Sequence, residues 1–257
     1  MLLAIDVGNT QIVIGLYDGE QLLDHWRIAT NDERTSDEHA SLINDFLGFH
    51  GFSFDDDVLG IVISSGVPRI TASLREMTER YFGFDPVVVG AGVKTGMPVL
   101  YENPREVGPD RIANAVGAFD IYGGPTVIVD FGTATTFEAV SAVGEYLGGA
   151  IVPGIEISLD ALFGRAALLR RVELVEPRNV IGKTSVESVQ SGAVYGFSAL
   201  VDGLVRRFEN ELGECTVVAT GGLGGLIASL STTIQHVEPW LTLHGLRLIY
   251  EKNAPTT

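Results

Sequence analysis

The stretch Ile5-Asp6-Val7-Gly8-Asn9-Thr10 ends an apolar run that begins at Met1, and it decides the fold because it recurs. Val129-Asp130-Phe131-Gly132-Thr133-Ala134 repeats the pattern, and its aspartate lies 124 residues after the first (130 − 6). Each copy is followed by an alternating run and a glycine-centred turn, at Gly19 and at Gly144. Similarity at one fixed offset indicates an internal repeat. We therefore expect two related halves, each opening with a buried strand that ends in Asp-x-Gly.

The chemistry of such a turn is specific. A carboxylate at the end of a buried strand is unfavourable unless a cation or hydrogen-bond donors meet it. The following glycine lets the backbone turn tightly and approach a ligand, and Thr or Asn beyond it offers N–H and hydroxyl groups to phosphate oxygens. One Asp-x-Gly alone is more simply a hairpin turn, but two copies in register favour a pair of phosphate-binding turns.

Composition narrows the class of protein. The 257 residues suit two domains, 46% of them are hydrophobic, and 33 acidic residues against 17 basic ones give a net charge of −16. This charge argues against a nucleic-acid partner or an anionic membrane surface, and no apolar run has the ~18 residues of a membrane span. The single Cys215 and the lack of a basic leader before the first strand fit a cytoplasmic protein. The five histidines show no metal-binding spacing.

The first half of the chain alternates strands and helices in a recognisable order. Apolar runs and turn signals predict strands at residues 2–7, 11–17, 21–30, 59–64 and 86–89, and helices at 40–50 and 70–82, the first capped near Thr35. This β-β-β-α-β-α-β order resembles the ribonuclease-H-like half of the actin, sugar-kinase and heat-shock-70 superfamily.

The second half repeats the meander after a long loop at 90–109 and a helix at 112–122. Strands are expected at 126–130, 135–142, 146–153 and 215–219, and helices at 157–169, within 186–212 and at 241–253. The predicted fold is α/β, with ribonuclease-H-like domains at 1–117 and 118–257. Each is expected to hold a mixed five-stranded sheet flanked by helices, with the active-site cleft between the domains.

The loop that precedes the central helix carries Asp110 and Arg111 side by side. Asp110 is a candidate general base for a hydroxyl group, and Arg111 is a candidate partner for a carboxylate. Spacing alone favours a plainer interpretation, in which Asp110 caps the helix and Arg111 is a solvated first-turn residue.

Thr220-Gly221-Gly222-Leu223 is a second candidate, because paired glycines let a base or ribose lie on the backbone. An ordinary Gly-Gly turn explains it equally well.

Ile181-Gly182-Lys183-Thr184-Ser185 matches only the end of a P-loop, without the first glycine or a preceding strand.

At these residues the chain resembles the type III pantothenate kinases over nearly its whole length. The matching motifs are Asp6–Thr10, Asn103–Arg111, Asp130–Thr136, Gly148-Gly149 with Pro153-Gly154, Gln190-Ser191-Gly192, Ala219–Leu223, and Leu241-Thr242-Leu243 with Gly245-Leu246. The family phosphorylates the primary hydroxyl of pantothenate with ATP, the first step of coenzyme A synthesis.

The resemblance implies a role for each matching residue. The ATP-binding residues would be Asp6, Val7, Gly8, Asn9, Thr10, Gln11, Ile12, Val13 and Thr133. Pantothenate would meet Tyr101, Gly108, Pro109, Asp110, Arg111 and Ser185, with Asp110 as the proton acceptor. Asp130 would bind the monovalent cation, K⁺ or NH₄⁺, that acts beside Mg²⁺. The resemblance also implies a homodimer, whose second subunit helps to build the pantothenate pocket.

The chain departs from the family pattern at two positions. Gln11 replaces the usual Asn or Thr in the phosphate turn, and Ser185 replaces a substrate-contacting Thr but keeps its hydroxyl. Two alternatives therefore stay open: another small-molecule enzyme of the superfamily, or a non-catalytic or weakly active relative that binds ATP or pantothenate and regulates a partner.

Overall fold

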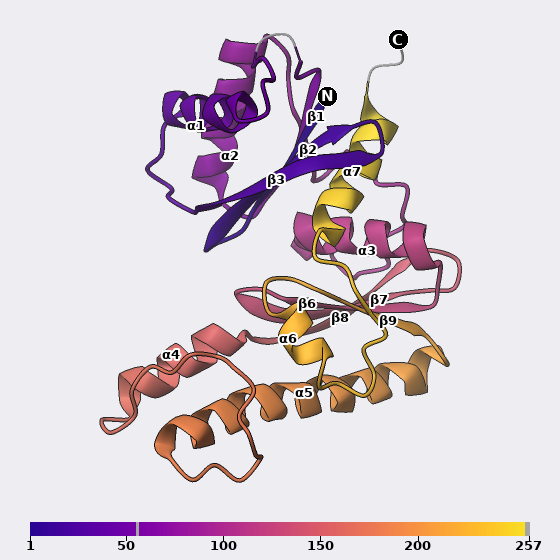
Figure 1. Cartoon of the computed structure of the whole chain (residues 1–257). Helices are drawn as coiled ribbons and strands as arrows, with labels where there is room; N and C mark the ends of the chain where they lie inside the picture. The colour runs from indigo at the N-terminus through magenta and orange to yellow at the C-terminus, as the bar shows by residue number, and fades with distance from the viewer. Residues whose placement is uncertain (55–56, 255–257) are drawn as a thin grey trace. The chain divides into compact units, whose positions relative to one another are not determined.

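The computed structural model describes residues 1–54 and 57–254, which form two compact units (Figure 1). The first unit comprises Met1–Pro98, Glu102–Gly117 and the residues from Leu241 onward. The second comprises Val99–Tyr101 and Ala118–Trp240. Each unit is built on its own five-stranded sheet.

The first sheet has the order β3-β2-β1-β4-β5, in which β1 is antiparallel to β2 and parallel to β4. Its strands are β1 (Leu2–Val7), β2 (Gln11–Asp18), β3 (Gln21–Ala29), β4 (Gly60–Ser65) and β5 (Val87–Val88). One face packs on α1 (Ser36–Gly48) and α2 (Pro68–Met77), which continues into a π-helical turn, Thr78–Phe82. The C-terminal helix α7 (Leu241–Asn253) also packs on this sheet, against β1, β2 and β4.

The second sheet repeats the first. Its order read from β8 is β8-β7-β6-β9-β10, so each strand takes the place of its counterpart in the first sheet. The strands are β6 (Thr126–Phe131), β7 (Ala134–Val140), β8 (Tyr146–Pro153), β9 (Thr216–Thr220) and β10 (His236–Val237). Helices α5 (Ser185–Leu212) and α6 (Gly224–Ala228) cover a core that includes Val127, Val129 and Phe131, and α4 (Ile155–Arg165) follows β8. The predicted repeat and fold class are confirmed.

Local signals set several element ends. Helix α1 begins at Ser36 because Thr35 forms a capping box with Glu38, in which each side chain accepts a hydrogen bond from the other's backbone N–H. Helix α3 (Pro109–Tyr122) begins with proline at its first position, where a missing N–H costs nothing. The short elements α6 and β10, and the 3₁₀ turn Pro104–Glu106, are too brief for periodicity to predict.

The division into domains differs from the predicted one at the C-terminus. Residues 241–257 were expected in the second half because they follow it in the chain, yet α7 belongs to the first unit. Its buried residues Leu243, Leu246 and Ile249 recur every three residues, and the helix packs on β1, β2 and β4. An apolar helix face is buried wherever a complementary surface exists, regardless of its place in the sequence.

Candidate functional site

The turn after β1 presents polar groups at the carboxyl end of a central strand. Asp6 is half-buried, whereas Asn9, Thr10 and Gln11 are exposed. The Gly8 N–H donates to the Gln11 carbonyl at 3.0 Å, and the Thr30 hydroxyl donates to the Gly8 carbonyl at 2.7 Å. These bonds fix the backbone of the turn, and Asn9, Thr10 and Gln11 lie at its surface. Ile12 and Val13, also expected to meet ATP, lie in β2, buried and half-buried.

The turn after β6 is built in the same way in the second unit. Asp130 is half-buried and Gly132 and Thr133 are exposed, and the Gly132 N–H donates to the Ala134 carbonyl at 3.1 Å. Gly154, at the end of β8, donates its N–H to the Thr133 carbonyl at 3.2 Å. A side chain at position 154 would overlap the backbone of Gly132 and Thr133. The Pro153-Gly154 sequence after β8 therefore indicates that two backbone segments lie close together at this point.

The structure brings the paired-glycine motif to Asp130. Gly221 has φ +86°, and a Cβ placed there would lie 2.5 Å from Asp130 Oδ1 and 2.7 Å from the Phe131 backbone N. Thr220, just before it, pairs with Asp130 across the parallel strands β9 and β6. Only glycine fits at position 221, because any side chain there would collide with the Asp130 carboxylate and the Phe131 backbone. The Thr220–Leu223 motif is therefore part of the Asp130 site rather than a separate turn.

Asp110 is exposed at the second position of α3, and the structure contradicts the interpretation that it caps this helix. The Ile112 N–H donates to the Gly108 carbonyl at 3.2 Å, so Gly108 holds the cap position. The Asp110 carboxylate lies over Gly108, in the space that a side chain there would fill. Arg111 is only 7% exposed, which contradicts the solvated first-turn interpretation.

The remaining substrate residues lie in the second unit. Tyr101 is half-buried, with its ring centroid 6.5 Å from that of Tyr146. Ser185 is the exposed first residue of α5, behind the capping residue Thr184, which accepts a hydrogen bond from the Glu187 N–H at 3.1 Å. No strand precedes this cap among the described residues 166–184, in keeping with the rejection of a P-loop.

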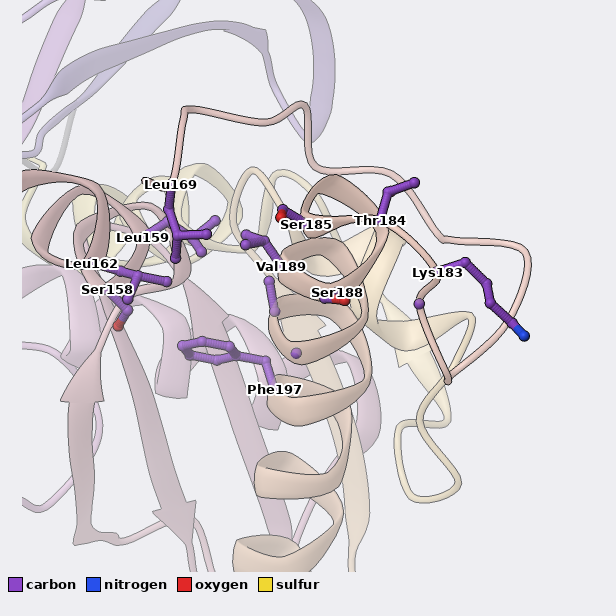
Figure 2. A pocket seen from close by; sticks show the side chains of 13 residues that line it. Ser158, Leu159, Leu162, Leu169, Lys183, Thr184, Ser185, Ser188, Val189 and Phe197 are labelled. Atoms are coloured by element: carbon purple, nitrogen blue, oxygen red, sulfur yellow. The ribbon is translucent and has the colours of Figure 1, made fainter. Parts of the chain in front are cut away.

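Ser185 lines a hollow of about 690 Å³ between α4 and α5 (Figure 2). Its floor is apolar: Leu159 and Leu162 come from α4, and Val189 and Phe197 come from α5. The Lys183 side chain points away from the other labelled side chains in Figure 2. Sequence reasoning missed this hollow, because its walls come from segments separated by an irregular loop.

A smaller hollow of about 420 Å³ lies at the carboxyl end of β4 in the first unit, lined by Ser65, Gly66, Pro68, Thr71, Ala72 and Arg75. Ser65 pairs with Val7 across the parallel strands, one residue beyond Asp6.

Within residues 1–54 and 57–254, no three His, Cys, Asp or Glu side chains gather in a way that would hold a metal ion by themselves. No described helix combines the length and apolar character needed to cross a membrane.

Two sheets of this order, repeated in one chain, define a two-domain actin-like fold. Solved structures share the fold at low sequence identity. A Campylobacter jejuni protein of the Baf family of transcriptional activators matches with TM-score 0.60 and 19% identity over 98% of each chain. A ROK family transcriptional regulator matches with TM-score 0.54 and 12% identity, over 98% of this chain and 78% of its own.

Sequence comparison gives the particular family. The profile of type III pantothenate kinases matches residues 2–207. The type III pantothenate kinase of Streptomyces griseus is 55% identical over 99% of both chains, and that of Moorella thermoacetica is 52% identical over 99% of this chain and 100% of its own. The chain belongs to the type III pantothenate kinase family.

Membership makes the chain a kinase that transfers phosphate to pantothenate in coenzyme A biosynthesis. Neither the profile nor the relatives support a regulatory role or a different small-molecule substrate.

Proposed function

We propose that pantothenate is phosphorylated at the residues expected from the sequence, with Asp110 as the base and the two Asp-x-Gly turns on the phosphates of ATP. The observation that carries this proposal is the Asp110 carboxylate. It stands exposed at the start of α3, folded over Gly108, and takes no part in capping its own helix.

In the proposed reaction the primary hydroxyl of pantothenate attacks the γ-phosphorus of ATP. The bond from that phosphorus to the β–γ bridging oxygen breaks, ADP leaves, and the hydroxyl proton passes to Asp110. Arg111 binds the substrate carboxylate through its planar guanidinium, and Tyr101 and Ser185 contact the rest of the molecule. The exposed groups of Asn9, Thr10 and Thr133 bind phosphate oxygens. Such a transfer depends more on positioning and charge neutralisation than on a strong base.

A monovalent cation, K⁺ or NH₄⁺, is proposed at Asp130. The half-buried Asp130 carboxylate offers oxygen ligands of the kind that suit a hard cation. With Mg²⁺ on the nucleotide, the bound ion would neutralise phosphate charge. Asp130→Ala should remove any rise of turnover with K⁺ or NH₄⁺ over Na⁺ at constant ionic strength. Cation-independent turnover of the unaltered chain would reject this role.

We also propose a homodimer in the cytoplasm. The second unit exposes an apolar surface around α4 and the start of α5, where Leu168 is 93% and Ile181 79% exposed. Exposed apolar groups gathered in one region indicate an interaction surface. Since Ser185 lies in the same region, a second copy bound there would complete the pantothenate pocket. The single cysteine suits a reducing compartment.

The proposal is tested by ATP turnover with and without pantothenate, in the unaltered chain and in Asp110→Asn. Removing a general base should lower kcat by roughly 10²–10⁴-fold, while the amide keeps the shape of the side chain. Circular dichroism should show an unchanged fold. Retention of more than about a third of kcat at saturating substrates would reject Asp110 as the base.

A further inference from the structure

One face of α3 joins the proposed base to a buried polar residue. Ala113 and Asn114 lie three and four residues after Asp110, and Gly117 lies three residues after Asn114, so the four share a helix face. Asp110 is exposed at the N-terminal end of this face, whereas Ala113 and Asn114 are 0% exposed. A fully buried amide is unfavourable unless it is hydrogen-bonded, so Asn114 requires a polar partner at this point in the fold.

The partner comes from the other end of the chain. The Thr242 hydroxyl of α7 donates to Asn114 Oδ1 at 2.7 Å. The two helices touch closely on either side of this bond. A Cβ at Gly117 would lie 2.9 Å from the Leu241 carbonyl oxygen, and one at Gly245 would overlap the Ala113 carbonyl oxygen. The glycines set the separation of the helices, and the hydrogen bond sets how α3 is turned and placed along α7.

Helix α7 also lies on the face of the first sheet that carries Asp6. Leu3, Ile5 and Val7 of β1 point into the core under α1 and α2, so Ala4 and Asp6 point to the other face. Ala4 pairs with Gly15, where an added Cβ would lie 2.8 Å from Cδ1 of Leu243 in α7. One helix of the first unit therefore contacts both the sheet that carries Asp6 and the helix that carries Asp110 in its first turn.

We propose that Asn114 and Thr242 are positioning residues, which hold Asp110 and Arg111 in register with the phosphate turn at Asp6. This inference rests on the proposed role of Asp110. The buried amide lies one helical turn after the proposed base, so its bond to Thr242 fixes α3 close to the point where the Asp110 side chain leaves the helix. Loss of the bond lets α3 rotate or slide, and a displacement of about 1 Å at a reacting group lowers turnover by up to ~10²-fold.

The test compares Thr242→Val, which removes the hydroxyl, with Thr242→Ser, which keeps it. Thr242→Val should lower kcat by about 10-fold or more and leave KM for ATP within about twofold, because the nucleotide contacts are unchanged. Thr242→Ser should keep at least about half of kcat. Thr242→Ala leaves room for a water molecule beside Asn114. It should show the same loss of kcat as Thr242→Val, and it replaces Thr242→Val in the test if the valine variant folds poorly.

Two controls separate positioning from stability and from the role of Asp110. Ile249→Val removes one methyl group from a fully buried residue of the same helix, so it should lower Tm without changing kcat. In an Asp110→Asn background at saturating pantothenate, Thr242→Val should lower the remaining kcat by less than about twofold, since the base is gone and Arg111 acts on substrate binding. Unchanged kcat in Thr242→Val and Thr242→Ala, or full additivity with Asp110→Asn, would overturn the proposal. An active Asp110→Asn variant would instead reject the base.

Discussion

At the scale of single residues, neighbouring side chains at the start of α3 have opposite environments. Asp110 is exposed and folded over Gly108, and Arg111 is buried one position later. Successive helix residues are turned by about 100°, so the two side chains leave the helix in different directions. These separate directions suit the roles proposed above, in which Asp110 accepts a proton from the hydroxyl and Arg111 binds the carboxylate of the same substrate.

Arg111→Ala is expected to raise KM for pantothenate by about 10-fold or more and to leave KM for ATP unchanged, because a charge-assisted hydrogen bond contributes about 1.5–3 kcal/mol. Arg111→Lys should restore binding only in part, since an ammonium group lacks the planar fork. Steady-state kinetics with pantothenate and with a neutral amide analogue checks the assignment. Equal losses for acid and amide would show that Arg111 only organises its loop.

Gly221→Ala is expected to lower both folded yield and turnover. Gly221 has φ +86°, which costs an L-residue about 1 kcal/mol, and the new methyl group would press on Asp130. Gly225→Ala is the matched control: Gly225 lies in α6 with nothing within 4 Å of an added Cβ. Thermal unfolding and kcat should be near the unaltered values for Gly225→Ala. If Gly221→Ala has the same Tm and kcat as Gly225→Ala, the close contact between Gly221 and Asp130 is not needed for stability or turnover.

At the scale of elements, α5 organises the second unit. Its buried residues Ala193, Val201 and Val205 pack under the second sheet. From the same helix Asp202 accepts hydrogen bonds from the hydroxyls of Ser231, Thr232 and Thr233, at 2.6, 2.6 and 2.9 Å. One helix thus packs the core and holds the loop that leads into β10.

The Asp202 contacts predict a dependence of stability on pH. Burial by itself would raise the pKa of Asp202, but the hydrogen bonds lower it from 3.8 to about 2. Because the folded pKa is the lower one, the stabilisation is present above about pH 4 and disappears as the pH falls towards about 2.

Asp202→Asn should therefore lower Tm by about 2–6 °C at pH 7, and the difference should narrow between pH 4 and pH 2. Asp18→Asn is the control, because it removes the same charge from the exposed last residue of β2, beside the Gly19-Glu20 turn. Calorimetry at several pH values makes the comparison. A difference that persists unchanged to pH 2 would show that the carboxylate charge is not the source of the stability.

At the scale of the whole molecule, the apolar surface of the second unit is the proposed contact between two copies of the chain. Its exposed residues are Ile157, Leu162, Leu168, Val175, Val180, Ile181 and Val186. Ile181→Asp should shift the chain from dimer to monomer in light scattering and raise KM for pantothenate. Val143→Asp is the control, since Val143 is 75% exposed but lies in the β7–β8 turn. A monomeric unaltered chain, or an Ile181→Asp dimer with unchanged KM, would contradict this interface.

The sequence by itself determined the internal repeat, the strand that ends in each Asp-x-Gly turn, the capping box at Thr35 and the bounds of α7. These features depend on side-chain period, turn chemistry and residues a few positions apart, which a linear pattern records.

Only the tertiary structure decided that α7 packs on the first sheet, that Gly221 lies against Asp130, and that Thr242 bonds Asn114 across 128 residues of chain. Periodicity shows that a helix face is apolar but not which complementary surface will cover it. The covering surface is determined by close packing of all the elements in one interior, which depends on their three-dimensional arrangement.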